Sequence, residues 1–514
     1  MTTIDRFEET VRNYGDKTAI IDNQGEHTFS ELRTRAIQFG ATIEKKANRT
    51  TNKPVAVCLN EGFDFVAAML GVLYSGNFYV PVIKEFPVYK IGKILKTIDP
   101  VLILTDLDKT MLFIKNGLSV STLLIDEEIE TDAKDIQDVS GYKRIIDVDP
   151  VYIVHTSGST GDPKGVIISH RALHDHILQL NRRFKINSEA IISCRNYFCY
   201  DAIVPEIYPM VFYGAQAVIM RPEKKKTTGN SVHDSYAETI QGIISELNKY
   251  RVNTLFYTTP LIKLIANEDG LREEKPLYLK RVQFGGDVMP VKLLNYWRRH
   301  LPDVEYSNVY GPTETTDVCS YYIADGKLPE EAMMPAGKAF DNREILIVSK
   351  EGKRILPGET GEVYIRGVSV GIGYWNKKEK SAESYVQNPL HNNYRDICYR
   401  TGDHATCDES GNILFIGRKD SQVKYQGNRV ELGEIEAAAL SKPGIKNCCV
   451  FFDEEKEKLI LFYEAEIETE KLAFMQYLHE RLQVIPAEYL RIVEFPRLSN
   501  GKIDRQSLFK RLSI

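Results

Sequence analysis

The chain has 514 residues, enough for more than one domain and for a sizeable hydrophobic core. Charged residues make up 27% of the sequence and hydrophobic residues 43%, a balance that is typical of a globular protein. The formal net charge of −5 gives no general electrostatic reason to expect nucleic acid or an anionic membrane as a partner.

Targeting signals and cysteine usage narrow the class further. Residues 1–6 contain no apolar core, so we do not expect a signal peptide. No run of about 18 apolar residues occurs, so we do not expect a membrane span. The eight cysteines are scattered without a CxxC pair, which favours reduced thiols over a zinc ribbon or a disulfide framework. We therefore expect a cytoplasmic protein.

Helices and strands alternate in the first third of the chain. A capped amphipathic helix is predicted over residues 28–44 and a buried strand over 54–59. A second helix over 61–75 and a strand-like segment over 77–82 follow. Such alternation favours βαβ units that share a parallel sheet.

A loop of glycine and hydroxyl residues, TSGSTGDPKG at 156–165, lies between apolar runs at 151–154 and 166–168. Glycines let backbone amides approach an anion, hydroxyls add donors, and Lys164 adds a positive charge. The loop is not a Walker motif, because a proline precedes the lysine and a glycine follows it. The stretch predicts a phosphate-binding loop, and a plain solvated turn is the alternative.

The second half of the chain changes character twice. Alternation continues to about residue 284, and after about residue 340 short strands joined by Gly/Pro turns predict a mainly β subdomain. The last hundred residues predict a helix, two strands, a helix over 469–483 and then a loose tail. We therefore predict an α/β protein with a large N-terminal domain over 1–418, built of parallel αβ-layered subdomains and a β subdomain. A small mobile α+β C-terminal domain is predicted over 419–514.

Five later stretches carry residues suited to nucleotide chemistry. In YGPTETT at 310–316 an aromatic ring could stack on a base, and a carboxylate could hold a magnesium-bound phosphate. YRTGD at 399–403 ends in a carboxylate suited to ribose hydroxyls. Taken singly, each could be an ordinary loop or a capping residue. The other stretches are GRKDSQVK at 417–424, GNRVELGEIE at 427–436 and NGKIDR at 500–505.

Together with the phosphate loop, and in this order, these stretches resemble the adenylate-forming enzymes. That family includes acyl-CoA synthetases, luciferases and the adenylation domains of nonribosomal peptide synthetases. Its members join a carboxylate to ATP, giving an acyl-AMP and pyrophosphate, and many pass the acyl group to a phosphopantetheine thiol. The resemblance implies ATP and Mg²⁺, because magnesium and a lysine neutralise charge when one anion attacks another.

The resemblance also assigns roles to residues of this chain. Lys502 is expected to bridge the substrate carboxylate and the α-phosphate, and Thr313 and Glu314 to lie by the α-phosphate, with Glu314 holding magnesium. Tyr310 is expected to stack on adenine and Asp403 to hold the ribose. The expected phosphate loop comprises Thr156, Ser157, Gly158, Ser159, Thr160, Gly161 and Lys164. The expected adenine and ribose contacts are Gly286, Asp287, Tyr310, Gly311, Asp403 and Arg418.

Asp201, in YDAIVPE at 200–206, points to amino acids within this family. It matches the aspartate that pairs with the α-ammonium in peptide synthetase adenylation domains and D-alanine–carrier protein ligases. A cation that enters a half-dry pocket needs a carboxylate, although Asp201 could instead be a capping residue. The resemblance places Ala202, Pro205, Tyr257, Gln283, Gly285, Val309, Asp317 and Val318 around the substrate. The polar members favour a polar side chain, and a second carboxylate could also favour a basic one.

The C-terminal part is expected to move between two half-reactions. By resemblance, Asp420 is the hinge and Gly427 is part of the tunnel for the pantetheine arm. No carrier-protein motif precedes Ile514, so we expect a free-standing enzyme, or an excised domain, with a separate phosphopantetheinylated carrier protein. The rival is an acyl- or aryl-CoA ligase. A catalytically idle binding member is disfavoured, because the phosphate loop, Asp403 and Lys502 are intact.

Overall fold

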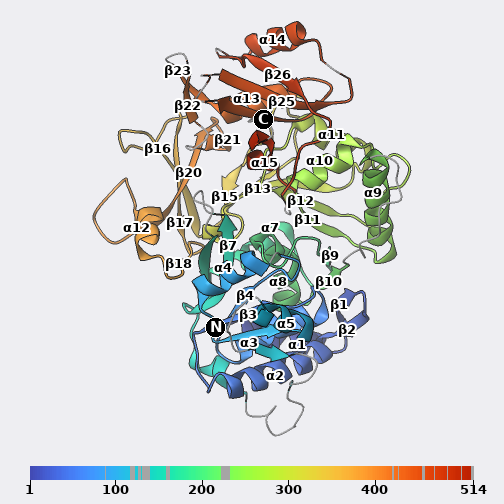
Figure 1. Cartoon of the computed structure of the whole chain (residues 1–514), viewed down its shortest axis with the longest axis vertical. Coiled ribbons are helices and arrows are strands. Elements are labelled where there is room, and N and C mark those ends of the chain that lie inside the picture. Colours follow the sequence, from blue (N-terminus) through green and yellow to red (C-terminus); the bar gives the residue numbers. More distant parts are fainter. Residues whose placement is uncertain are drawn as a thin grey trace.

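The computed structural model describes the chain except for residues 87, 116–121, 125–128, 130–138, 158–162, 221–231, 419–421, 426–427, 454–455, 457, 468, 483, 499–500 and 511–514. Figure 1 shows the N-terminal elements at one end of the molecule and the last elements of the chain at the other. Within the described residues, no helix combines the length and the apolar character needed to cross a bilayer.

The N-terminal part is built on a sheet that, over the described residues, has seven strands in the order β18-β8-β7-β4-β3-β5-β6. Strands β3 to β7 pair in parallel, whereas β7 and β8 form an antiparallel pair on either side of the predicted phosphate loop. The bounds are β3 Pro54–Cys58, β4 Phe78–Pro81, β5 Leu102–Thr105, β6 Thr122–Leu124, β7 Pro150–Ser157, β8 Pro163–Ser169 and β18 Gly373–Tyr374.

Helices cover this sheet because their sequences supply apolar faces. The helix predicted to begin near residue 28 is α2 (Phe29–Lys46), and Thr28 and Glu31 form its capping box. Helix α3 (Phe63–Tyr74) is apolar on almost every side, and nearly all of its residues are buried. The other helices are α1 Thr3–Tyr14, α4 Val88–Ile98 and α5 Leu107–Lys115.

A second, larger sheet has nine strands within the described residues, in the order β15-β14-β13-β12-β11-β9-β10-β1-β2. The six central strands of the described sheet, in the order β13-β12-β11-β9-β10-β1, are parallel, so their carboxyl ends meet at one edge. The strands are β1 Thr18–Asp22, β2 Gly25–Thr28, β9 Ile191–Ser193, β10 Gln216–Ile219, β11 Thr254–Thr258, β12 Arg281–Gly285, β13 Glu305–Tyr310, β14 Ser320–Ile323 and β15 Lys338–Ala339. Helix α7 (His170–Phe184) leads from β8 of the first sheet to β9 of this one. The helices that follow strands of this sheet are α8 Val204–Tyr213, α9 Val232–Lys249, α10 Thr259–Asn267 and α11 Val291–His300.

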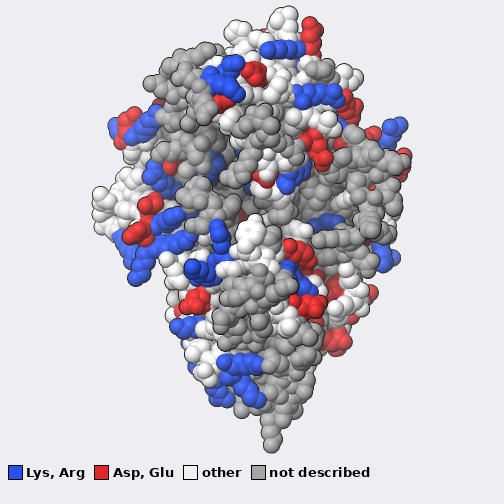
Figure 2. Space-filling model, in the orientation of Figure 1, with Lys and Arg blue, Asp and Glu red and all other residues white. Residues whose placement is uncertain are grey.

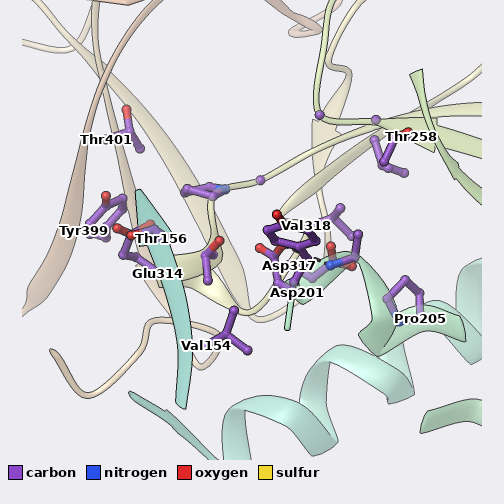
Figure 3. A pocket seen from close by; sticks show the side chains of 18 of the residues that line it. Val154, Thr156, Asp201, Pro205, Thr258, Glu314, Asp317, Val318, Tyr399 and Thr401 are labelled. Atoms are coloured by element: carbon purple, nitrogen blue, oxygen red, sulfur yellow. Dashed lines mark hydrogen bonds between the residues drawn. The ribbon is translucent and has the colours of Figure 1, made fainter. Parts of the chain in front are cut away.

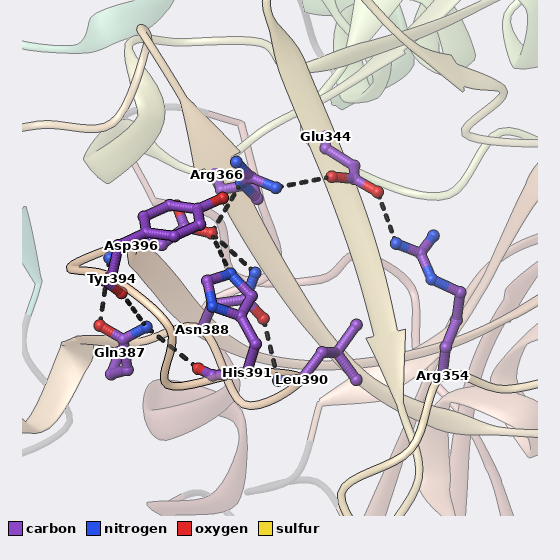
Figure 4. A network of polar contacts seen from close by, with 9 residues as sticks. All are labelled: Glu344, Arg354, Arg366, Gln387, Asn388, Leu390, His391, Tyr394 and Asp396. Atoms are coloured by element: carbon purple, nitrogen blue, oxygen red, sulfur yellow. Dashed lines mark hydrogen bonds and ion pairs between the residues drawn. The ribbon is translucent and has the colours of Figure 1, made fainter.

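The predicted β subdomain is an antiparallel sheet of β16, β17, β19, β20 and β21. Asp396 anchors the turn before β20: it accepts from Asn388 and His391 and forms an ion pair with Arg366 on β17, which also pairs with Glu344 on β16 (Figure 4). The network ties β16 and β17 to the turn that leads into β20, the strand that carries Asp403. The bounds are β16 Arg343–Val348, β17 Gly361–Gly367, α12 Lys378–Ser384, β19 Tyr385–Gln387, β20 Ile397–Cys407 and β21 Ile413–Arg418.

The C-terminal elements form an α+β unit with its own buried cluster of apolar side chains. The predicted loose tail is wrong in part, because β26 joins β25 in parallel and α15 follows it. The helix predicted over 469–483 is shorter, since α14 ends at His479. The bounds are β22 Gln422–Tyr425, β23 Asn428–Glu431, α13 Leu432–Ser441, β24 Ile445–Asp453, β25 Lys458–Ala465, α14 Lys471–His479, β26 Glu488–Arg491 and α15 Arg505–Lys510.

Polar contacts dock this C-terminal unit onto α10 and α11. The Lys446 ammonium lies 3.0 Å from the carboxylate of Glu268, just beyond α10, and both side chains are 12% exposed. The Lys292 amine on α11 donates to the carbonyl oxygens of Lys442 and Ile445 at 2.9 and 3.1 Å.

Figure 2 shows basic and acidic side chains interspersed over the described residues of the face of the molecule that is drawn there. The α/β class predicted from the sequence is confirmed, and the boundary between residues 418 and 419 stays a prediction.

Candidate active site

A cavity of about 970 Å³ lies at the edge where the parallel strands of the nine-stranded sheet end (Figure 3). Thr258, Gly285 and Val309 line it from the carboxyl ends of β11, β12 and β13. Ligands of open α/β sheets bind at this edge, where strand ends and loops leave a crevice. The seven-stranded sheet, the β subdomain and the C-terminal unit each supply further walls, through Thr156, Thr401 and Lys502.

The structure brings most of the predicted site residues together. Those that line the cavity are Thr156, Lys164, Asp201, Ala202, Pro205, Tyr257, Gln283, Gly285, Gly286, Val309, Gly311, Thr313, Glu314, Asp317, Val318, Arg418 and Lys502. Ser157, Asp287, Tyr310 and Asp403 are chain neighbours or hydrogen-bonded partners of lining residues. Gly158, Ser159, Thr160, Gly161, Asp420 and Gly427 lie outside the described residues.

Thr156 and Lys164 face each other as register partners on β7 and β8. The Lys164 ammonium lies 5.1 Å from the centre of the Tyr374 ring. Next to Thr156, burial lowers the pKa of His155 to about 4, so its imidazole is neutral near pH 7. Lys164 is therefore the cation that the two strands offer to an anion at this end of the cavity.

Glu314 is the buried carboxylate of this end. It sits in the short 3-10 turn η3 (Thr313–Thr315) and accepts a hydrogen bond of 2.7 Å from the Tyr374 hydroxyl. Among the described residues, no group of three or more His, Cys, Asp or Glu side chains could hold a metal by itself. One carboxylate fits Mg²⁺ nevertheless, because this ion is commonly held by one or two carboxylates together with substrate phosphates and water.

Asp403, Tyr310 and Arg418 form a connected group at another wall. Asp403 on β20 and Arg418 on β21 are register partners, and Arg418 Nη1 lies 3.0 Å from Asp403 Oδ1. The Tyr310 hydroxyl donates to Asp403 Oδ2 at 2.5 Å. Burial and the Asp403 carboxylate raise the pKa of Tyr310 well above its usual range, so the phenol stays a donor. The group offers an aromatic ring, a carboxylate and a guanidinium within one small volume.

Lys502 reaches the cavity from a tight turn of the C-terminal unit. Leu498 and Lys502 are joined by a backbone hydrogen bond of 2.8 Å, and Gly501 has φ +80. A Cβ built on Gly286 would lie 3.8 Å from Cε of Lys502, so the lysine passes directly over this glycine. The Lys502 charge favours the ionised forms of Asp201 and Asp287. It therefore sits between the expected substrate and nucleotide walls.

Asp201 begins the turn η2 (Asp201–Ile203), which leads into α8, and its carboxylate accepts from the amide of Ala202 at 3.0 Å. Burial raises the pKa of Asp201, and hydrogen bonding by Thr313 together with the charge of Lys502 opposes that shift. A carboxylate held in this way favours a cationic group of the ligand.

The turn around Thr313 is positioned by close backbone packing. A Cβ built on Gly311 would lie 2.3 Å from the carbonyl oxygen of Asp317 and 2.5 Å from Cα of Val318. No side chain fits there, so the chain folds back tightly and presents Thr313, Glu314 and Asp317 to one cavity.

Several residues of the site were not predicted from the sequence. Asn196 lines the cavity, and its amide donates to Glu206 at 2.7 Å and to the carbonyl of Phe256 at 3.1 Å. Tyr374 contacts Glu314 from β18. Arg343 pairs with Asp175 behind the cavity wall. One sequence feature could have pointed to the Arg343–Asp175 pair: the helix α7 carries several polar residues on its buried side, which are His170, Asp175, His176 and Gln179.

A family model described as "AMP-binding enzyme" matches residues 7–375. Zwittermicin A synthase ZmaJ of Bacillus cereus is 30% identical, and the match covers 98% of this chain and 93% of that protein. Gramicidin S synthase 2 of Aneurinibacillus migulanus is 29% identical over 98% of this chain. The chain spans 11% of gramicidin S synthase 2 and 44% of tyrocidine synthase 1 of Brevibacillus parabrevis.

Solved structures share the fold. Klebsiella oxytoca NpsA in complex with 3-hydroxyanthranilyl-AMSN matches all of this chain and 99% of its own with a TM-score of 0.82 at 21% identity. The anthranilate CoA ligase AuaEII in complex with anthranoyl-AMP matches 99% of this chain and 97% of its own, with a TM-score of 0.83 at 18% identity. The solved structures share the fold, and the family model together with the relatives shows that the chain belongs to the AMP-binding enzymes as an adenylation domain of the nonribosomal peptide synthetase type.

Proposed function

We propose that this adenylation domain activates an amino acid as an aminoacyl-AMP, with release of pyrophosphate, and then transfers it to the phosphopantetheine thiol of a carrier protein. The observation that carries the proposal is the place of Asp201. Asp201 lines the same cavity as Lys502, and the charge of that lysine favours the ionised form of the Asp201 carboxylate. A substrate with an ammonium and a carboxylate on one carbon matches this pair of opposite charges.

Each wall of the cavity supplies residues for one of the proposed roles. Asp201 holds the α-ammonium, and Lys502 lies between the substrate carboxylate and the α-phosphate. Tyr310 and Asp403 bind the adenosine, and Lys164 and Thr156 bind the outer phosphates. Magnesium, when bound at Glu314, would neutralise phosphate charge. Because both reacting groups are anions, holding them together against their repulsion is the main catalytic task of these residues.

The docking of the C-terminal unit supports a role for domain motion. Lys502 belongs to this unit, whose described contacts with α10 and α11 include polar ones such as Lys446 with Glu268. Such an interface can open at a modest cost. We propose residues 419–514 as the mobile domain, with Asp420 at its hinge and Gly427 in the pantetheine tunnel. Transfer to a carrier protein would use the arrangement in which Lys502 has withdrawn.

ATP–pyrophosphate exchange tests the first half-reaction. The panel contains the proteinogenic amino acids, their D-forms, and aryl and fatty acids without an α-amine. Exchange with an amino acid is expected, and exchange only with acids that lack the amine would favour the acyl- or aryl-CoA ligase. Product formation with a holo carrier protein against coenzyme A tests the second half-reaction.

Two substitutions assign the roles. Lys502→Met is expected to keep ATP binding and to lower the exchange rate by about 10²- to 10³-fold, the size of effect seen when one transition-state donor is lost. Lys350→Met, at an exposed lysine of the β subdomain, is the matched control. Asp201→Asn is expected to raise KM for the amino acid and to leave KM for ATP unchanged. An unchanged amino-acid KM would remove the ammonium role from Asp201.

A further inference from the structure

Asp317 is a second carboxylate on the wall of the substrate cavity. It lines the cavity but is only 7% exposed, and Figure 3 shows it in the same region as Asp201. Thr316 and Asp317 have φ +60 and +68, so two successive residues other than glycine hold left-handed backbone. This conformation is costly, above all for a β-branched residue. The fold therefore fixes the Asp317 side chain at a place that an ordinary loop would not give it.

Arg343, whose charge acts on Asp317, is already paired with another carboxylate. Arg343 on β16 donates to the backbone carbonyl of Val318 and forms a buried ion pair of 3.4 Å with Asp175 on α7. Asp175 also accepts from the amide of Asn342 at 2.8 Å. Since the guanidinium and the Asp175 carboxylate cancel each other's charge, Arg343 cannot fully neutralise Asp317 as well.

The group that directly faces Asp317 is neutral. Arg343 Nη2 lies 3.3 Å from Nδ1 of His176, and a guanidinium can only donate, so Nδ1 must accept. The imidazole proton then sits on Nε2, which lies 3.4 Å from Asp317 Oδ2. Burial and the Arg343 charge lower the pKa of His176 well below its usual range. His176 therefore brings a dipole to Asp317 but no positive charge.

Asp317 Oδ2, Gln283 Nε2 and His176 Nε2 are buried polar atoms without a hydrogen-bond partner within the described part of the chain. The 3.4 Å between His176 Nε2 and Asp317 Oδ2 is a close approach without hydrogen-bond geometry. Gln283 also lines the cavity and is 2% exposed. A buried polar group without a partner costs free energy. If rotation of the Asp317 or Gln283 side chain brings such an atom to the cavity, a ligand group of matching chemistry recovers that cost. The carboxamide of Gln283 can turn its oxygen toward a donor by rotating about its last bond.

The electrostatic environment agrees with this picture. Burial raises the pKa of Asp317 well above its usual range, and the charges of Asp201 on η2 and Glu206 on α8 add to the shift, while Arg343 opposes it. The Tyr152 hydroxyl on β7 lies close enough to Asp201 and Asp317 for both to act on it. These effects bias the Asp317 carboxyl group toward its protonated form while no cation is beside it, and a cation placed beside it would favour the carboxylate.

We propose that the amino acid activated here carries a second amine, whose ammonium pairs with Asp317 while the α-ammonium pairs with Asp201. The inference rests on the proposed amino-acid activation and adds the class of side chain. A diamino acid gives each buried carboxylate its own cation. An amino acid with an apolar side chain would leave Asp317 Oδ2 and Gln283 Nε2 without hydrogen-bond partners.

The test is pyrophosphate exchange by the whole chain with two sets of substrates. One set contains 2,3-diaminopropionate, 2,4-diaminobutyrate, ornithine and lysine, and the other contains alanine, serine, asparagine, glutamine and leucine. For the wild type, kcat/KM is expected to be at least about tenfold higher for one diamino acid than for any neutral amino acid, since a hydrogen bond to a charged group is worth at least that factor.

Asp317→Asn is expected to lower the ratio of kcat/KM for the diamino acid to that for a neutral one by roughly 10- to 100-fold. This ratio does not depend on the fraction of folded enzyme. Asp325→Asn, the same change at an exposed carboxylate just after β14, is expected to leave the ratio unchanged. Exchange with a neutral amino acid alone, or an equal ratio in Asp317→Asn, would overturn this inference and leave amino-acid activation standing. Exchange with no amino acid at all would overturn the proposed function as well.

Discussion

Arg343 links the β subdomain to the wall of the cavity, and its replacement tests how that wall is held. Its guanidinium lies 3.4 Å from Asp175 in a buried ion pair and also donates to the backbone of Val318. Arg343→Met keeps much of the side-chain volume and removes the charge. The Asp175 carboxylate then stays buried with neutral partners only, among them the amide of Asn342.

The expected loss follows from this geometry. At 3.4 Å and an effective dielectric constant of about 20, the attraction between the two charges is about 5 kcal/mol. Breaking a buried pair by removal of one partner typically costs about 3–5 kcal/mol. Because Asn342 still donates to Asp175, we expect a loss nearer to about 3 kcal/mol in the free energy of unfolding.

Urea unfolding followed by circular dichroism gives the measurement. The double variant Asp175→Asn with Arg343→Met removes both charges and is expected to be more stable than Arg343→Met alone, because no carboxylate is left buried without a cation. Arg354→Met is the control, since Arg354 is 54% exposed and its ion pair with Glu344 is expected to contribute less than about 1 kcal/mol. A double variant no more stable than the single one would refute the reasoning.

Three further predictions concern the nucleotide and the docked C-terminal unit. Asp403→Asn is expected to raise KM for ATP by roughly 10- to 100-fold, through loss of charged hydrogen bonds, with little change in KM for the amino acid. Lys446→Met or Glu268→Gln breaks the docking ion pair, and single-turnover adenylate formation is expected to slow by about tenfold; an unchanged rate would show that the pair does not hold the docked arrangement. Burial lowers the pKa of Lys292 from 10.5 to about 8, so between these values the undocked amine holds a proton that the docked amine has lost. Docking should therefore strengthen as pH rises from about 8, measured by energy transfer between dyes on the two units, and this trend should vanish in Lys292→Met.

Those site residues that lie within short contiguous motifs could be predicted from the sequence. Asp201 and Lys502 are 301 residues apart in the numbering, yet each lies in a recognisable stretch, and the structure places both at one cavity. The strands around the phosphate loop were predicted for the same local reason, since apolar runs flank a glycine-rich loop. Roles for these residues remain predictions that the proposed experiments test.

The pair of Arg343 and Asp175 could not be predicted in this way. Arg343 opens a strand, and its partner lies 168 residues earlier on the buried face of α7. The sequence around Arg343 does not indicate Asp175 as a partner, nor the reverse, because the two residues meet only after the subdomains have packed. The ordered tail was missed for a similar reason: β26 is stabilised by its pairing with β25 and not by a strong pattern of its own.

The left-handed backbone at Asp317 limits how this domain could acquire a new selectivity. At φ +68 glycine, asparagine and aspartate are tolerated well, whereas β-branched residues are strongly disfavoured. Gly311 packs closely against the same segment, so the backbone at residue 317 has little room on that side. A library randomised at residue 317 should thus return few functional variants with valine, isoleucine or threonine, even when the intended substrate is apolar. Redesign toward apolar substrates would be better directed at Gln283, which lies in the regular strand β12.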